Sequence, residues 1–136
     1  MSVKTDVNLN RAEVLTALGA LGCLLGVATG AFGAHALEHA VSPERLGTWE
    51  KAVDYLFVHS LGLIMIGMLD RFEPRPCHTW SGGLMLAGII LFSGSLFALV
   101  LSGLGALGMI TPIGGASFIL AWLALGICYL KPTRRP

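Results

Sequence analysis

Residues 80–101, with the sequence WSGGLMLAGIILFSGSLFALVL, carry no charged side chain over their whole length. A helix needs about 20 mostly apolar residues to cross the hydrocarbon core of a bilayer, so this stretch predicts a transmembrane helix. Three further stretches have the same character, at about residues 14–37, 52–69 and 110–130. We therefore predict an all-α membrane protein, a bundle of four transmembrane helices with short loops that forms a single domain over residues 1–136.

The composition of the chain supports this prediction and argues against several classes of function. Hydrophobic residues make up 54% of the sequence and charged residues 12%, with a mean hydropathy of +0.75. Soluble domains carry about 25% charged residues. The net charge of +1 and the lack of a basic stripe argue against a nucleic-acid partner. No hydrolase triad order, P-loop or dinucleotide-binding glycine motif is present, so we expect no enzymatic activity.

The positions of lysine and arginine predict the orientation of the four spans. With an even number of spans, both termini and the middle loop lie on one side. That side holds seven basic residues, which are Lys4, Arg11, Arg71, Arg75, Lys131, Arg134 and Arg135, whereas the other side holds Arg45 and Lys51. Basic residues favour the cytoplasmic side, so we predict that both termini are cytoplasmic. Trp49 and Trp80 lie near predicted span ends, where an aromatic belt is expected.

The first span is also the one that resembles a signal peptide, because Ala34-His35-Ala36 fits the small-x-small cleavage pattern. The apolar run is too long for that role, so we expect it to remain as a transmembrane helix. Between the first two spans, Ser42-Pro43-Glu44 predicts a helix start, with a capping serine and a proline in the first turn.

Glycines recur at helical spacing and predict where the helices pack closely. Transmembrane helices associate through small residues that let their backbones approach. The candidate packing residues are Gly22, Gly26, Gly30 and Gly33 in the first span, Gly94 in the third, and Gly114 and Gly115 in the fourth. These faces either pack the helices within one chain or hold a partner helix or a second copy.

The cysteines give no sign of a cross-link or a metal site. Cys23, Cys77 and Cys128 are far apart and show no ligand spacing. We therefore expect no structural disulfide and no metal bound by the cysteines.

Four polar side chains at membrane depth form the candidate site, namely His35, Asp54, Tyr55 and His59. An ionisable residue within a membrane is costly and is a functional candidate by default. Three interpretations remain open. The cluster forms hydrogen bonds that fix helix register, or binds a quinone head group, lipid or proton, or ligates haem or metal through His35 and His59. His39 and His78 fall in predicted loops, where we expect solvated side chains.

Four ordered motifs resemble the transmembrane protein 256 family, also called domain of unknown function 423. They are GAFGAH at residues 30–35, AVDY at 52–55 followed by His59, FSGSL at 92–96, and GMITPIGG at 108–115. The resemblance implies a small four-span protein, in bacteria located in the inner membrane, with no assigned activity. It also implies that His35, Tyr55 and His59 fall on motif positions, as do Gly30, Gly33, Ser93, Gly94, Thr111, Pro112 and Gly114. Many relatives have a glutamine where this chain has Asp54, which weakens any mechanism that needs a carboxylate there.

The function predicted from these features is that of a small, non-enzymatic inner-membrane protein. We expect an accessory subunit or assembly factor that contacts lipid and docks on a larger membrane complex through its glycine faces. The alternative is an oligomeric small transporter, or a lipid- or quinone-binding membrane protein, that uses His35, Tyr55 and His59. Neither hypothesis requires a resident cofactor.

Overall fold

A capping box starts the first helix. The computed structural model describes residues 10–131. The Asn10 side chain accepts a hydrogen bond from the Glu13 backbone N–H, and the Glu13 carboxylate accepts one from the Asn10 backbone N–H. Helix α1 (Arg11–Phe32) continues into η1 (Gly33–Leu37), a turn of π-helix. This helical run ends where the first predicted span ends.

The second helix begins well before the second predicted span. The Ser42 side chain accepts a hydrogen bond from the Arg45 backbone N–H, and Pro43 fits the first turn. Helix α2 (Pro43–Phe72) has 30 residues and so is about 45 Å long, more than the roughly 30 Å of a hydrocarbon core. Its first turns therefore extend beyond the apolar part of the membrane.

The third span is one continuous rod made of three segments. Helix α3 (Pro76–Gly88) passes through the π-helical turn η2 (Ile89–Gly94) into α4 (Ser95–Ser102). The rod ends at Gly103, whose φ of 74° lies in the left-handed region that glycine adopts without a steric penalty.

The fourth span follows a short 3-10 helix, η3 (Gly105–Met109), and is formed by α5 (Thr111–Leu130). The described residues therefore contain four helical segments that are long and apolar enough to cross a membrane. The prediction of an all-α, four-helix membrane bundle is confirmed.

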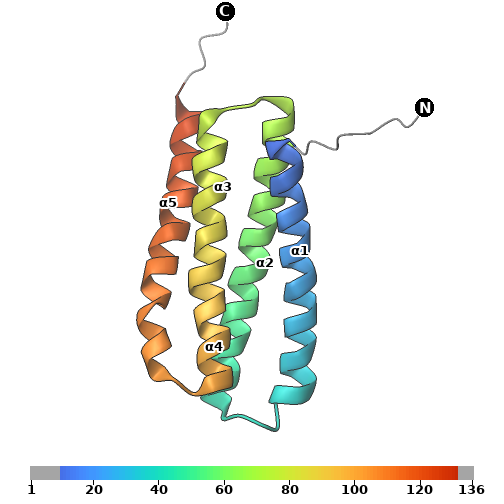
Figure 1. Cartoon of the computed structure of the whole chain (residues 1–136), viewed down its shortest axis with the longest axis vertical. Coiled ribbons are helices and arrows are strands. Elements are labelled where there is room, and N and C mark those ends of the chain that lie inside the picture. Colours follow the sequence, from blue (N-terminus) through green and yellow to red (C-terminus); the bar gives the residue numbers. More distant parts are fainter. Residues whose placement is uncertain (1–9, 132–136) are drawn as a thin grey trace, which may run out of the picture.

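The helices lie side by side as two neighbouring pairs, α1 with α2 and α3 with α5 (Figure 1). Helix α2 also contacts the rod formed by α3, η2 and α4, which joins the two pairs. The start of α1 and the end of α5 lie at the same end of the bundle, called here the terminal end (Figure 1). Which side of the membrane this end occupies stays a prediction.

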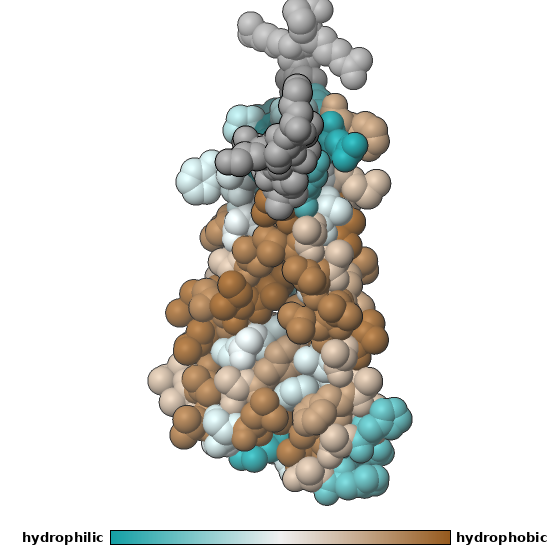
Figure 2. All heavy atoms as spheres, turned by 45° about the vertical axis from the view of Figure 1, so that its right-hand side comes forward, coloured by the Kyte–Doolittle hydropathy of each residue, from teal (hydrophilic) through white to brown (hydrophobic). Residues whose placement is uncertain are grey.

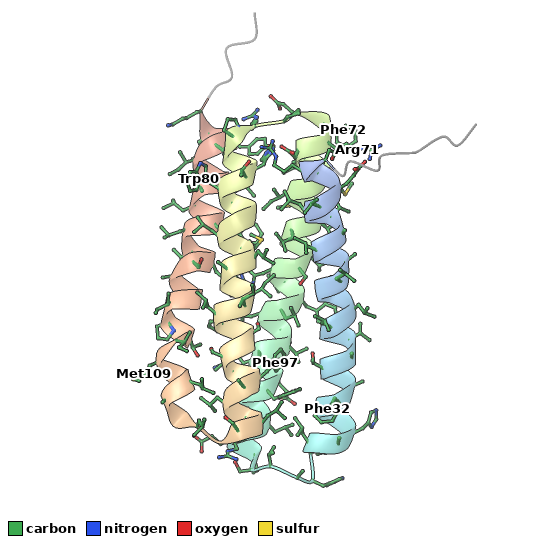
Figure 3. All side chains as sticks on the ribbon, in the orientation of Figure 1. Phe32, Arg71, Phe72, Trp80, Phe97 and Met109 are labelled. Atoms are coloured by element: carbon green, nitrogen blue, oxygen red, sulfur yellow. A yellow bond between two sulfur atoms is a disulfide. The ribbon has the colours of Figure 1, made fainter. Side chains whose placement is uncertain are left out.

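The surface carries an apolar belt between two more polar ends (Figure 2). Large apolar side chains such as Leu24 on α1 and Ile119 on α5 are well exposed, as a lipid-facing surface requires. Arg71, Phe72 and Trp80 lie toward the terminal end, and Phe32 lies toward the opposite end (Figure 3).

Two apolar clusters fill the interior. One contains Leu63, Ile66 and Met85, which are fully buried. The other contains Trp49, which is 3% exposed and lies between Phe32 and Phe97. The expectation that Trp49 belongs to an interfacial belt was wrong. Its indole N–H donates a hydrogen bond to the Thr29 carbonyl at 2.8 Å, so the tryptophan joins α1 to α2. Trp80, by contrast, is 72% exposed.

Candidate functional site

The imidazole of His59 is buried near the middle of α2. Sixteen residues of α2 precede it and thirteen follow, and the side chain is 5% exposed. Its Nδ1 lies 2.7 Å from the Tyr55 carbonyl oxygen. Because a carbonyl oxygen only accepts, Nδ1 must carry the proton and donate. In the neutral ring the other nitrogen, Nε2, therefore presents a lone pair.

Aromatic rings from three segments surround this imidazole. The ring of Phe118, from α5, stacks on His59 with centroids 3.4 Å apart and an interplanar angle of 13°. Tyr55 stacks on Phe92, from η2, at 4.3 Å, and Trp122 lies 6.2 Å from His59. A π-helical turn such as η2 alters the side-chain register of a helix and is frequent at functional sites. Here it contributes Phe92 to the wall beside Tyr55.

A hollow of about 320 Å³ lies against this wall, lined by Asp54, Tyr55, Val58 and His59. We call it the His59 hollow. Among the described residues, Nε2 of His59 has no hydrogen-bond partner, and it is not one of the polar atoms sealed from the surface. Asp54, Tyr55 and Val58 are exposed, so the hollow is open to the membrane. The imidazole of His59, whose Nε2 has no partner among the described residues, thus lines a hollow that is open to the membrane.

The structure does not bring His35 to these three residues. His35 lies in η1 with an exposed side chain, and within residues 10–131 no hydrogen bond or ring contact joins it to Asp54, Tyr55 or His59. Nor do the described residues contain a group of three or more metal-ligating side chains. Asp54, Tyr55 and His59 thus remain together as the candidate site, while a role for His35 stays a prediction.

The glycines of α1 face α2 and are in close contact with it. A Cβ atom added at Gly22 would lie 2.1 Å from Ser60 Oγ, and one at Gly26 would lie 2.8 Å from the Phe57 ring. A Cβ added at Gly33, in η1, would lie 2.7 Å from the Trp49 ring, and one added at Gly30 would lie 3.5 Å from Val53. Helix α2 therefore already occupies this glycine groove, which leaves no space in it for a partner helix.

The glycines of the other spans differ from one another. At Gly114 an added Cβ would lie 2.4 Å from the backbone nitrogen of Phe92, so α5 and η2 meet backbone to backbone. A Cβ added at Gly115 would make an ordinary contact with the Phe92 ring, at 3.8 Å. At Gly94 an added Cβ would meet nothing within 4 Å among the described residues.

A second polar cluster, which the sequence analysis did not identify, lies at the terminal end. His78 Nδ1 is 2.9 Å from Asp70 Oδ1, and His78 Nε2 is 3.0 Å from the Tyr129 hydroxyl. Arg11 forms a two-pronged ion pair with Asp70, with Nε donating to Oδ2 at 2.7 Å and Nη2 donating to Oδ1. This cluster connects all four spans. The expectation that His78 is a solvated loop residue was wrong, because it is fully buried in the first turn of α3.

Beside this cluster, Cys77 and Cys128 form a disulfide between α3 and α5. The expectation of no disulfide was therefore wrong, although Cys23 remains a free thiol. Arg75 reinforces the same junction by donating to the Cys128 carbonyl at 3.1 Å and by placing its guanidinium 4.4 Å from the Tyr129 ring centroid. The cross-link and its neighbours hold the first turn of α3 to the last turn of α5.

These features define a class, that of small four-span membrane proteins with almost no extramembrane structure in the described residues. Comparison with known proteins narrows the class. The model of a family described as "Protein of unknown function (DUF423)" matches residues 29–115. This chain belongs to that family, as its motifs predicted.

Curated bacterial relatives share most of the sequence. A UPF0382 membrane protein of Staphylococcus epidermidis is 46% identical over 119 residues, which cover 88% of this chain and 97% of the relative. The UPF0382 membrane protein YwdK of Bacillus subtilis is 42% identical over 88% of this chain and 98% of its own length. No solved structure is significantly similar to the chain. The protein is therefore a multi-pass membrane protein of an uncharacterised family.

Proposed function

We propose that this protein binds an amphipathic, ring-bearing ligand of the quinone class from the membrane in the His59 hollow. The observation that carries the proposal is the unpartnered Nε2 of a histidine that is 5% exposed at mid-helix depth. A polar group in such a place is costly unless it finds a partner, and a ligand would supply one.

The surroundings of the hollow suit a flat ring that arrives from the lipid. Tyr55 and Val58 are 41% and 55% exposed, so a ligand can enter sideways without crossing the bundle. Tyr55 also presents an aromatic surface beside His59, and aromatic rings stack favourably with one another. A ligand tail would then lie along the apolar outer surface of the bundle, as lipid tails do. In this arrangement the Tyr55 ring would stack on the ligand ring, and His59 would form the polar contact with it.

Equilibrium dialysis of the purified protein in detergent against a short-tailed quinone and its hydroquinone would test this proposal. We expect saturable binding that is lost in His59→Phe, because phenylalanine keeps the stacked ring but removes Nε2. His39→Phe is the matched control, since His39 is exposed in a turn outside the hollow. Equal binding by both variants, or no binding by the unmodified protein, would refute the proposal.

An accessory-subunit role is the second candidate, supported by the openness of α1. This helix packs mainly against α2, and its outer face exposes Leu21, Leu24 and Val27. Because the glycine groove of α1 is occupied by α2, docking would use this outer face. Purification from native membranes in a mild detergent would test the idea. Co-elution of another membrane protein at near-equal stoichiometry supports it, whereas elution alone or as a homo-oligomer opposes it.

A further inference from the structure

We infer that the His59 hollow selects the reduced, hydroxyl-bearing form of its ligand, a hydroquinone-type ring, over the oxidised quinone. This inference rests on the proposed function, since it specifies which ring chemistry the same hollow recognises. It depends on the direction of the hydrogen bonds that the lining residues can make.

Nε2 of His59 can accept a hydrogen bond but cannot donate one. The proton on Nδ1 is committed to the Tyr55 carbonyl oxygen at 2.7 Å. A second proton on Nε2 would create an imidazolium ion near the middle of a membrane-spanning helix, where a charge is costly. The ring is therefore neutral and Nε2 is a hydrogen-bond acceptor. Only a ligand with a donor can satisfy it.

Asp54 lines the same hollow. It precedes His59 by five residues on α2, which corresponds to about 7.5 Å along the helix axis. Its carboxyl oxygens are also hydrogen-bond acceptors. Among the described residues Asp54 takes part in no ion pair, since the ion pairs there involve other residues. The hollow thus offers acceptors at Nε2 of His59 and at the Asp54 carboxyl oxygens, while the Tyr55 hydroxyl can both donate and accept.

The oxidised and reduced forms of a quinone ring differ in the hydrogen bonds that they can make. An oxidised quinone presents two carbonyl acceptors, so it could accept from the Tyr55 hydroxyl but would leave Nε2 of His59 without a donor. A hydroquinone presents two O–H donors, one of which can donate to Nε2 of His59. Sites built to hydrogen-bond a hydroxyl reject analogues that lack it strongly, because their own polar groups are then left unpaired. We expect the hydroquinone to bind at least tenfold more tightly.

The test uses the full-length, unmodified protein and three ring probes under argon without added reductant, so that the Cys77–Cys128 disulfide stays intact. The probes are a tetramethyl hydroquinone, the corresponding quinone, and the dimethoxy derivative, which has the same ring but no O–H donor. Equilibrium dialysis gives each dissociation constant. Tighter binding of the hydroquinone than of both other probes, by tenfold or more, supports the inference.

Other outcomes separate this inference from the proposal beneath it. Equal or tighter binding of the quinone or of the dimethoxy derivative, with His59→Phe abolishing it, overturns the selectivity while leaving the binding site in place. Absence of binding by all three probes overturns both. His59→Gln provides a variant that keeps an acceptor, and it should bind the hydroquinone better than His59→Phe does. The reverse order for these two variants would also overturn the selectivity.

Discussion

Replacing Gly114 by alanine should destabilise the bundle, because this glycine allows the backbones of α5 and η2 to approach each other closely. The added Cβ would lie 2.4 Å from Phe92 N and 2.8 Å from both Leu91 C and Phe92 Cα. All three atoms belong to the backbone of η2, so no flexible side-chain tip can move aside. The helices themselves must separate to relieve the overlap.

The expected magnitude follows from two opposing effects. Overpacking a tight interface costs about 1–3 kcal/mol. Alanine is favoured over glycine in a helix by up to about 1 kcal/mol, which offsets part of this cost. We therefore expect Gly114→Ala to lower the free energy of unfolding by about 1–2 kcal/mol.

Gly126 provides the matched control on the same helix. A Cβ added there would meet nothing within 4 Å among the described residues, so Gly126→Ala should be neutral or slightly stabilising. Reversible unfolding in mixed micelles of increasing denaturing-detergent fraction, followed by far-ultraviolet circular dichroism, measures both variants. Identical unfolding midpoints for the two alanine variants, or a higher midpoint for Gly114→Ala, would refute the close contact.

Three further outcomes are expected. Asp70→Asn should cost about 3 kcal/mol of unfolding free energy, the lower end of the range for breaking a buried pair, because the Arg11 side chain is 38% exposed and can reach water. Asp54→Asn, at an exposed position, should leave the midpoint of the same unfolding curve unchanged. Equal effects of the two substitutions would contradict a stabilising role of the ion pair between Arg11 and Asp70. Cys77→Ser should lower the free energy of unfolding by up to about 4 kcal/mol, the loop-closure value for a separation of 51 residues. Cys23→Ser should not lower it, because Cys23 is a free thiol. An unchanged unfolding curve for Cys77→Ser would contradict the cross-link. A reporter that is active only in the cytoplasm should work when fused to the C-terminus, and activity of a periplasmic reporter there would reverse the predicted orientation.

The four spans could be predicted from the sequence because the length and hydrophobicity of a membrane helix are local properties. The structure places helix ends within a few residues of most predicted limits, and the larger difference, at the start of α2, was indicated by Ser42 and Pro43. The stacking of Tyr55 on His59 is consistent with their i, i+4 spacing, which places both side chains on one face of α2.

Contacts between distant segments were harder to predict, because they depend on how the helices pack. The burial of His78 requires Asp70 and Tyr129, which lie 8 and 51 residues away in the chain. A signal for the disulfide was nevertheless present. Cys77 immediately precedes the third predicted span and Cys128 lies just before the end of the fourth, so both belong to the same side of the membrane. Two cysteines at the same end of antiparallel helices can meet, whatever their separation in the sequence.

The uneven distribution of strong links along the bundle determines how it can move. The Cys77–Cys128 disulfide and the ion pairs of the described residues, such as that between Arg11 and Asp70, all lie at the terminal end. Toward the other end, Trp49 and Phe97 hold the helices mainly by apolar packing. We therefore expect a bundle that is cross-linked at one end to resist separation of its helices most strongly at that end.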